Sequence, residues 1–393
     1  MPTPRISIVI PAYRSTRLRE CLDALAETRC STPAETIVVL NGASPEVARI
    51  ARGHDAVTQV VQVPVNLGVS GAFNHGFALA KGELLVQLQD DAIVHPDWLT
   101  PLVECADSAP DIGAVGGLIL SPDGVVVDAG AVVWRDGSTA PGLVDGSRDA
   151  GAYTTARAID YHGSAGMLLR RQAWEGVAGF DDGYYPAYYG DVDMCFRLRE
   201  RGWRVMVDPR AHVVHSAGAS TAAPFRTFLG YRHRARFVER HHTALDGHGL
   251  PRTDPAGVTA EMARAAAWPA GPAPTAVTPD ERRRLGDRLQ WDGLEVAARE
   301  RDVWIAFAAT LAEQSDAAAD AAGARITSLA GALHDEQRNS AHLVRRLTAA
   351  LAQLDDVQAD REAAHLALQQ ARADIDRITR SRSWRYTRPL RRD

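Results

Sequence analysis

The first 240 residues alternate short apolar runs with segments whose apolar residues recur at helical spacing. The apolar runs are rich in β-branched residues and occupy residues 6–10, 36–40, 59–63 and 83–88. Residues 17–26 and 70–80 have the spacing of amphipathic helices. Near-continuous apolar strands separated by helices are typical of parallel sheets that are covered on both faces. The pattern therefore predicts an α/β fold with an open, mainly parallel sheet.

The pattern changes from about residue 244 onwards. Residues 248–280 are rich in Pro, Gly, Ala and Thr, which is typical of a linker. The rest of the chain lacks strand signals, and a seven-residue apolar repeat begins at Ile326 and continues to Ile378. The length of this repeat favours a coiled coil that forms a homo-oligomer, although an amphipathic helix packed on its own domain gives a similar pattern.

These changes divide the chain into four predicted parts. They are an α/β domain at residues 1–243, a linker at 244–285, a helical, coiled-coil-like region at 286–380 and a tail at 381–393. In the tail, arginines are interleaved with Trp384 and Tyr386. This composition suits an anionic membrane surface, and a solvated basic tail is the alternative.

Composition narrows the classes of function. The 44 basic and 49 acidic residues give a net charge of -5, so the charge of the whole chain does not indicate nucleic-acid binding. No apolar run approaches the ~20 residues of a membrane span, and the first residues do not read as a signal peptide. The four cysteines lack metal-binding spacing. We expect a cytoplasmic protein, and we expect any membrane contact to be peripheral, at the inner face of the plasma membrane.

The most informative polar residues are Gln89, Asp90 and Asp91, which directly follow the apolar run 83–88. Open α/β sheets bind their ligands at the carboxyl ends of the strands. Adjacent carboxylates are costly there unless a cation pairs with them. A hard divalent cation held by only one or two carboxylates keeps coordination positions free for diphosphate oxygens. This motif therefore predicts a metal and nucleotide site.

A glycine-rich segment at residues 66–76 precedes this motif. Its glycines let the backbone approach a ligand closely, and the helix that begins there favours an anion. The glycine spacing does not match the dinucleotide-binding fingerprint. The candidate nucleotide-binding residues of this segment are Asn66, Gly68, Gly71 and Asn74.

Asp191 and Asp193 lie at the start of a predicted buried helix. Acidic residues there commonly cap free amides, and two residues two positions apart do not share a helix face. We therefore expect at most one of them to point into a cleft, where it could act as a general base. His215 ends another apolar run and becomes a candidate ligand once a metal is expected.

Taken in order, these segments resemble the inverting glycosyltransferases of the GT-A fold, in particular the bacterial rhamnosyl- and galactofuranosyl-transferase-like group. The resemblance covers about residues 5–225. The matching segments are residues 6–13, 66–76, 89–91, 113–117, 179–181, 190–193 and 213–215.

The resemblance implies a role for individual residues in binding the donor. Asp91 would bind a divalent metal, Mg²⁺ or Mn²⁺, and His215 would complete the metal shell. Asp90 is expected near the donor sugar, and Asn41 near the position that recognises the base. The residues that would border the nucleotide base are Pro11, Ala12 and Tyr13.

The resemblance also implies the reaction. Asp191 matches the carboxylate that deprotonates the acceptor hydroxyl group. The donor would be a dTDP- or UDP-sugar, and the acceptor a cell-surface glycan or its lipid-linked precursor. Transfer would be a single in-line displacement that inverts the anomeric carbon.

Three residues depart from the family pattern. Gln89 replaces an acid or Asn, Leu40 replaces an Asp, and Gly190 replaces the Glu before Asp191. Two alternative functions therefore stay open. A nucleotidyltransferase would need a glycine-rich loop after the first strand, but residues 11–15 contain no glycine. A degenerate, non-catalytic scaffold is the other alternative.

Overall fold

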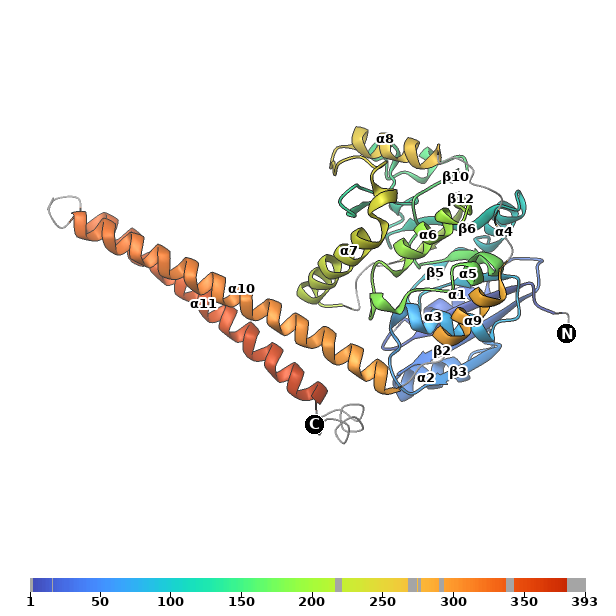
Figure 1. Cartoon of the computed structure of the whole chain (residues 1–393), viewed down its shortest axis with the longest axis horizontal. Coiled ribbons are helices and arrows are strands. Elements are labelled where there is room, and N and C mark those ends of the chain that lie inside the picture. The colour runs from blue at the N-terminus through green and yellow to red at the C-terminus, as the bar shows by residue number, and fades with distance from the viewer. Residues whose placement is uncertain are drawn as a thin grey trace. The chain divides into compact units, whose positions relative to one another are not determined.

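The computed structural model describes residues 3–15, 17–215, 221–267, 274, 277–289, 293–336 and 343–379. The chain forms two compact units, Met1–Asp292 and Gly293–Asp393. The first unit contains the sheet with its helices, and the second contains two long helices (Figure 1).

The first half of unit one alternates strands and helices as the sequence predicts. Its elements are β1 (Ile6–Ala12), α1 (Leu18–Ala26), β2 (Ala34–Asn41), α2 (Pro45–Arg52), β3 (Gln59–Val63), α3 (Gly68–Leu79), β4 (Leu84–Gln87), β5 (Ile93–Val94), α4 (Leu99–Asp107) and β6 (Ile112–Leu120).

The second half of this unit combines several very short strands with the long strand β12 and with more helix. Its elements are β7 (Val126–Asp128), β8 (Val132–Val133), β9 (Thr139–Ala140), η1 (Val144–Gly146), η2 (Ala150–Ala152), β10 (Arg157–Ala158), β11 (Met167–Arg170), α5 (Arg171–Gly176), η3 (Asp182–Tyr184), α6 (Gly190–Glu200), β12 (Arg204–Val214), α7 (Ala223–Leu245), α8 (Pro255–Ala266) and α9 (Pro279–Leu289).

The main sheet has the strand order β10-β12-β6-β11-β4-β1-β2-β3, with β5 beside β12 and β7 beside β6. Strand β1 pairs in parallel with β2 and β4, and β12 pairs in parallel with β6. Only β11 separates β4 from β6, and it is antiparallel to both. Strands β4 and β6 therefore point the same way, and their carboxyl ends share one edge with those of β1, β2 and β12. The predicted mainly parallel α/β sheet is confirmed.

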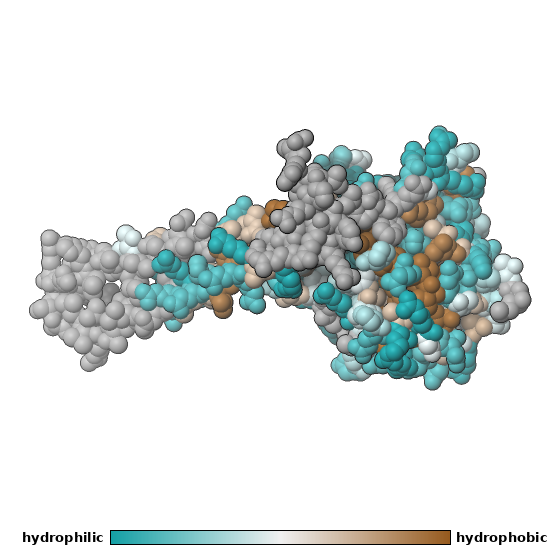
Figure 2. All heavy atoms as spheres, turned by 90° about the horizontal axis from the view of Figure 1, so that it is seen from below, coloured by the Kyte–Doolittle hydropathy of each residue, from teal (hydrophilic) through white to brown (hydrophobic). Residues whose placement is uncertain are grey.

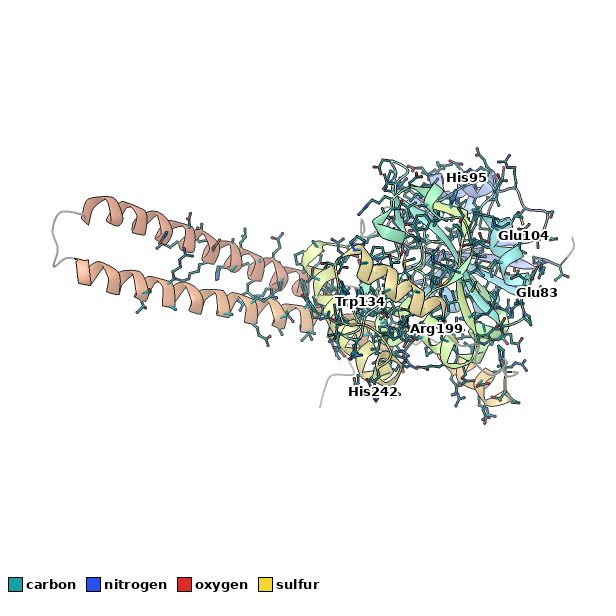
Figure 3. The ribbon with its side chains drawn as sticks, turned by 90° about the horizontal axis from the view of Figure 1, so that it is seen from above. Glu83, His95, Glu104, Trp134, Arg199 and His242 are labelled. Carbon is teal, nitrogen blue, oxygen red and sulfur yellow. The ribbon has the colours of Figure 1, made fainter. Side chains whose placement is uncertain are left out.

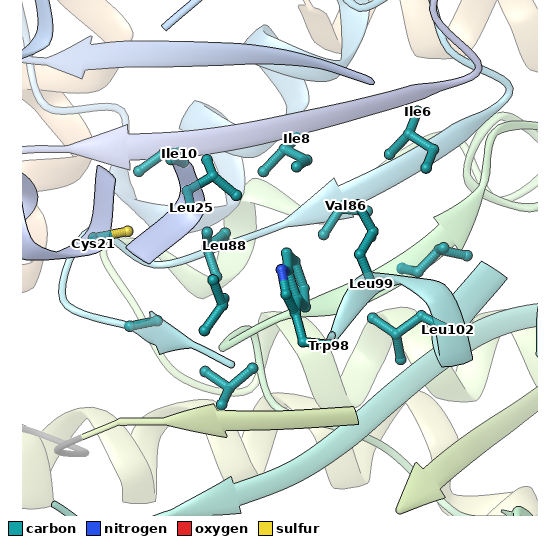
Figure 4. Close-up of a cluster of buried hydrophobic side chains, with 14 of the residues drawn as sticks. Ile6, Ile8, Ile10, Cys21, Leu25, Val86, Leu88, Trp98, Leu99 and Leu102 are labelled. Carbon is teal, nitrogen blue, oxygen red and sulfur yellow. The ribbon is translucent and has the colours of Figure 1, made fainter. Parts of the chain in front are cut away.

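One face of the sheet packs on α1, α2 and α4. Alternate residues of each strand reach this face, because successive side chains of a strand point to opposite sides. Figure 4 shows part of this core, in which β1 contributes Ile6, Ile8 and Ile10 and α4 contributes Leu99 and Leu102. The other residues of each strand point to the opposite face, which is also covered, and both sets of residues are therefore apolar.

Helix α3 covers the opposite face of β1 and β2. Gly76 makes this approach possible, because a Cβ atom there would overlap Cγ1 of Val9. Aromatic rings extend the packing towards α5, with the rings of Phe77 and Trp174 in edge contact at a centroid distance of 5.6 Å. The start of α3 is thereby fixed at the carboxyl edge of the sheet.

The structure differs from the expected linker at residues 244–285, because the segment contains α8 and the first turns of α9. Pro255, Thr278 and Pro279 belong to the starts of these helices. Asp254 caps α8 by accepting a hydrogen bond of 2.8 Å from the amide of Gly257. Thr278 and Glu281 form a reciprocal capping pair at the start of α9, with bonds of 2.8 and 3.2 Å.

Ion pairs with a buried aspartate and apolar contacts attach α8 to the rest of the first unit. Arg264 of α8 pairs with Asp160, which is fully buried and also pairs with Arg199 of α6. Met262 packs beside Trp134. Trp134 and Arg199 mark this part of the unit in Figure 3.

The second unit is a hairpin of α10 (Gly293–Glu336) and α11 (Leu343–Thr379), which pack along each other. The apolar repeat from Ile326 to Ile378 therefore crosses from one helix to the next, and Ala371 of this repeat is buried. The described side chains on the face seen in Figure 2 are mostly hydrophilic. The predicted tail at 381–393 lies outside the described residues.

Candidate active site

Asp91 and His215 meet at the carboxyl edge of the sheet. Nε2 of His215 lies 3.2 Å from Oδ1 of Asp91. The short strand β5 creates this contact, because Ile93 pairs with Val214 and so draws the loop after β4 to the end of β12. A carboxylate oxygen and an imidazole nitrogen that converge in this way are suitable ligands for Mn²⁺ or Mg²⁺. The two predicted metal ligands are thus brought together.

Asp90 connects the metal motif to the end of β1. Its Oδ2 accepts a hydrogen bond of 3.3 Å from the amide of Tyr13, and its carbonyl oxygen accepts one of 3.2 Å from the hydroxyl group of Ser15. Burial and the neighbouring charge of Asp91 raise the pKa of Asp90 to about 7. A cation bound at Asp91 would oppose this rise and favour the ionised form.

Gln89 ties the metal motif to the chain that precedes β11. Its Nε2 donates a hydrogen bond of 2.5 Å to Oγ of Ser164. The backbone of Ser164 in turn favours the ionised form of Asp191, so the two residues are neighbours. Gln89 therefore couples the strand end that carries Asp91 to the carboxylate of Asp191.

Asp191 and Asp193 occupy different environments on α6, as their spacing predicts. Burial raises the pKa of Asp191, although its Oδ1 accepts a hydrogen bond of 2.9 Å from the amide of Val192. Burial opposes ionisation of Asp193 too, but Arg197, His241 and Arg240 outweigh it and hold its pKa well below the usual range. Asp193 is fully buried in this ion network. Asp191 is therefore the carboxylate suited to accept a proton.

The comparisons with known proteins identify the family of the chain. The sequence model of the family described as "Glycosyltransferase like family 2" matches residues 4–229. The chain belongs to this family. The family 2 match spans the sheet and ends within α7. The predicted resemblance to glycosyltransferases is confirmed.

Two curated relatives come from cell-surface glycan synthesis. The O-antigen biosynthesis protein RfbC of Myxococcus xanthus is 31% identical over 239 residues, which is 56% of this chain and 18% of that protein. The N-acetylglucosaminyl-diphospho-decaprenol L-rhamnosyltransferase of Mycobacterium tuberculosis is 26% identical over 241 residues, which is 53% of this chain and 76% of that protein.

A third relative, an uncharacterized protein of Sinorhizobium fredii, is 27% identical over 229 residues, which is 56% of this chain and 25% of that protein. The chain thus spans a quarter or less of the length of this protein and of RfbC. Among solved structures, GalNAc-T7 with UDP, GalNAc and Mn²⁺ superposes with a TM-score of 0.50 at 14% identity. The match covers 73% of this chain and 55% of that one and shows a shared fold.

The three departures from the family 2 pattern have local explanations. Gln89 contacts Ser164 without adding a third negative charge to Asp90 and Asp91. Leu40 is fully buried in the core under α1 and α2. Gly190 lies against α3, where a Cβ atom would overlap Oγ of Ser70. A side chain at position 190 would therefore require the hydroxyl group of Ser70 to move.

The asparagines predicted to bind the nucleotide sugar are engaged within the protein. Oδ1 of Asn41 accepts a bond of 2.7 Å from the amide of Leu67, and its Nδ2 donates to Oδ1 of Asn66 at 2.9 Å. Asn74 is 2% exposed and bonds both backbone groups of Phe180, at 2.8 and 2.9 Å. The structure does not support a donor contact for Asn74, because its amide points into the core.

Two further predicted positions, Gly68 and Gly71, lie in the first turn of α3. Gly68 has a φ of 73°, and a Cβ atom there would lie 2.8 Å from the carbonyl oxygen of Pro186. At Gly71 a Cβ atom would lie 3.0 Å from Cβ of Leu67. Both glycines therefore allow close packing around the start of α3.

The three residues predicted to border the base, Pro11, Ala12 and Tyr13, follow one another at the carboxyl end of β1. Ala12 pairs with Leu40 across the β1–β2 ladder. This register places them beside Asn41, at the same edge of the sheet as the metal motif. Pro11, Ala12 and Tyr13 therefore lie at the predicted edge of the sheet. Their contact with a nucleotide base stays a prediction.

Sequence reasoning missed His162 and Ser164, which lie between β10 and β11. The ring of His162 is buried, with Nδ1 2.7 Å from the carbonyl oxygen of Gly163 and Nε2 2.8 Å from that of Gly117. Gly116 makes room for this ring. The small residues around Ser164, just before an apolar run, are the signal that could have indicated a tight approach.

A second group of potential metal ligands, Asp160, His248 and Glu261, lies under α8. Arg199 and Arg264 already neutralise Asp160. Nδ1 of His248 lies 2.6 Å from the carbonyl oxygen of Val133, a contact that requires a proton on that nitrogen. A metal would have to displace these bonds, so we assign this group to the attachment of α8.

Proposed function

We propose that this chain is a metal-dependent, inverting glycosyltransferase. It transfers a sugar from a nucleotide-diphosphate sugar, with dTDP- and UDP-sugars as first candidates, to a hydroxyl group of a cell-surface glycan or its lipid-linked precursor. The single observation that carries this proposal is the placement of Asp91, His215 and Asp191 at one edge of the sheet, linked through Gln89 and Ser164.

The donor half of the site is built around Asp91 and His215. Oδ1 of Asp91 and Nε2 of His215 would hold a divalent cation, and the neighbouring Asp90 would keep the loop after β1 in place. The cation would offset the negative charge that grows on the leaving diphosphate. A structure of the same fold, GalNAc-T7, is described with UDP and Mn²⁺, which agrees with this assignment.

The acceptor half of the site depends on Asp191. Its carboxylate takes the proton of the acceptor hydroxyl group as that oxygen forms a bond to the anomeric carbon. The bond from the anomeric carbon to the diphosphate oxygen breaks on the opposite side, and the diphosphate leaves with the electron pair. The raised pKa of Asp191 brings its basicity closer to that needed at neutral pH.

The relatives indicate the class of acceptor. RfbC is named for O-antigen biosynthesis, and the mycobacterial relative for rhamnosyl transfer to N-acetylglucosaminyl-diphospho-decaprenol. By analogy, we infer a sugar acceptor that is carried on a lipid or on a growing polysaccharide.

Release of nucleotide diphosphate from a panel of UDP-, dTDP- and GDP-sugars tests this proposal. We expect the chain to release nucleotide from one donor when Mn²⁺ or Mg²⁺ is present, and to lose this activity when EDTA is added. Turnover that continues unchanged in EDTA would contradict the metal assignment. Pyrophosphate release from a nucleoside triphosphate and a sugar phosphate would instead indicate a nucleotidyltransferase.

A further inference from the structure

Asp128 is an acidic residue near the proposed base that has no assigned role. It ends β7, which pairs with the last residues of β6 at the carboxyl edge of the sheet. Asp128 lies opposite Ile119, whereas Val126 lies opposite Leu120, so the strand bulges at Val127. Bulges beside active sites commonly redirect a side chain. The backbone thus places Asp128 at the same edge as the site.

The carboxylate of Asp128 lacks a full set of partners. Its Oδ1 is buried and accepts no hydrogen bond from any described residue. The amides of Ala129 and Gly130 favour its charged form, and so does His162. Buried carboxylate oxygens without a donor are uncommon, because the lost hydration is not replaced. An external hydroxyl group would supply the missing donor.

The charged groups around Asp128 include Asp191. Burial raises the pKa of Asp128, and the negative charge of Asp191 raises it further. Burial also raises the pKa of Tyr161, and the charges of Asp128 and Asp191 add to that rise. Asp128 favours the charged form of Arg157, but the two residues form no ion pair within the described part of the chain. Asp128 therefore lies within electrostatic range of Asp191.

Gly163 lies against Asp191 and against the cross-strand neighbour of Asp128. A Cβ atom at Gly163 would lie 3.8 Å from Oδ2 of Asp191 and 4.0 Å from Cδ1 of Ile119, which pairs with Asp128. A methyl group would fit there at ordinary contact distance. The glycine therefore adds no side chain of its own beside Asp191.

We propose that Asp128 binds a second hydroxyl group of the acceptor sugar, adjacent to the hydroxyl group that Asp191 deprotonates. This inference rests on the proposed function and names the acceptor as a sugar ring with two neighbouring free hydroxyl groups. Asp128 would orient the ring, and Gly163 would leave the volume that the ring enters. Water, which has no second hydroxyl group, would not need Asp128.

The experiment compares transfer with hydrolysis of the same donor. Wild-type protein is screened with p-nitrophenyl glycosides and polyprenyl-diphosphate N-acetylglucosamine, and the acceptor that turns over fastest is kept. Because the acceptor hydroxyl group would then donate to a neutral amide oxygen instead of a carboxylate, we expect Asp128→Asn to raise the KM for this acceptor about tenfold. We expect kcat to stay within about threefold and donor hydrolysis without acceptor to be unchanged.

Two further variants sharpen the test. Gly163→Ala should also raise the acceptor KM while hydrolysis is preserved, because its methyl group narrows the same volume. Asp123→Asn is the matched control, since Asp123 lies in the exposed turn of the same β6–β7 hairpin and loses the same charge. Its acceptor KM should equal that of the wild type.

An unchanged acceptor KM in Asp128→Asn would overturn the inference. So would an equal loss of transfer and hydrolysis in a variant that keeps the wild-type melting temperature, because Asp128 would then serve the donor. Failure of the wild type to release nucleotide from any donor would instead contradict the proposed function itself.

Discussion

Gln89 shows how one neutral side chain connects the two halves of the site. Its amide reaches Ser164 across the β4–β11 ladder, at the point where β4 ends and β11 has not yet begun. This contact holds Ser164, whose backbone neighbours Asp191, against the end of β4, which leads to Asp91. Positioning of this kind matters because small displacements of catalytic groups are costly in rate.

A double-mutant cycle tests this connection at the residue scale. We expect Gln89→Leu and Ser164→Ala each to lower the rate of sugar transfer by about tenfold. The double variant should be no slower than the slower single variant, because both changes remove the same contact. If the rate loss of the double variant equals the product of the two single losses, the two residues act independently and the connection is contradicted.

The polar contacts of the site were the part least accessible from the sequence. Asp91, His215 and Asp191 were identified because each stands at the end or start of a patterned element. The bond from Gln89 to Ser164 joins positions 75 residues apart, and no local pattern records it. The environment of Asn74 was equally hidden, since this polar residue of the glycine-rich segment is a buried link to Phe180.

At the scale of elements, hydrophobic periodicity identified the strands and helices of the first half of the sheet. It did so because both faces of β1, β2 and β4 are covered. It did not reveal that β11 is antiparallel, because a four-residue apolar strand has no directional signal. It also missed α8 and α9, because their Pro and Thr residues belong to helix starts and read as linker composition.

The contact of α3 with the sheet provides a test at this scale. Gly76→Ala should destabilise the chain by about 1–3 kcal/mol, because the new Cβ atom would overlap Val9. Gly230 in α7 is a matched control, since a Cβ atom there meets nothing within 4 Å. Gly230→Ala should be neutral or stabilise by up to about 1 kcal/mol, because alanine restricts the unfolded chain. Equal urea midpoints for the two variants would contradict the tight packing of α3.

At the scale of the whole molecule, the family match and the main sheet both lie in the first compact unit. The helical hairpin forms the second unit. Among the described residues, no helix combines the length and apolar composition needed to cross a membrane. Within the hairpin Ala371 is buried, while Ile305 and Leu366 remain 51% and 62% exposed. Self-association through this hairpin stays a prediction.

Truncation separates these parts. A chain that ends at Asp292 should melt cooperatively and be monomeric by light scattering, whereas the full chain should be larger than a monomer. A chain that ends at residue 244 should melt at a lower temperature, because Asp160 would lose Arg264 and Arg201 would lose Glu281. Full chain and truncated chain with the same oligomeric state would contradict self-association through the hairpin.

The most direct test of the proposed transferase site is the Asp191→Asn variant, assayed with the donor and acceptor that the wild type uses. Removing the general base should slow transfer by about 10²–10⁴-fold. The affinity for nucleotide diphosphate with Mn²⁺ should stay unchanged, because Asp91 and His215 are intact. If Asp191→Asn turns over at the wild-type rate, Asp191 is not the base and the proposed mechanism is wrong.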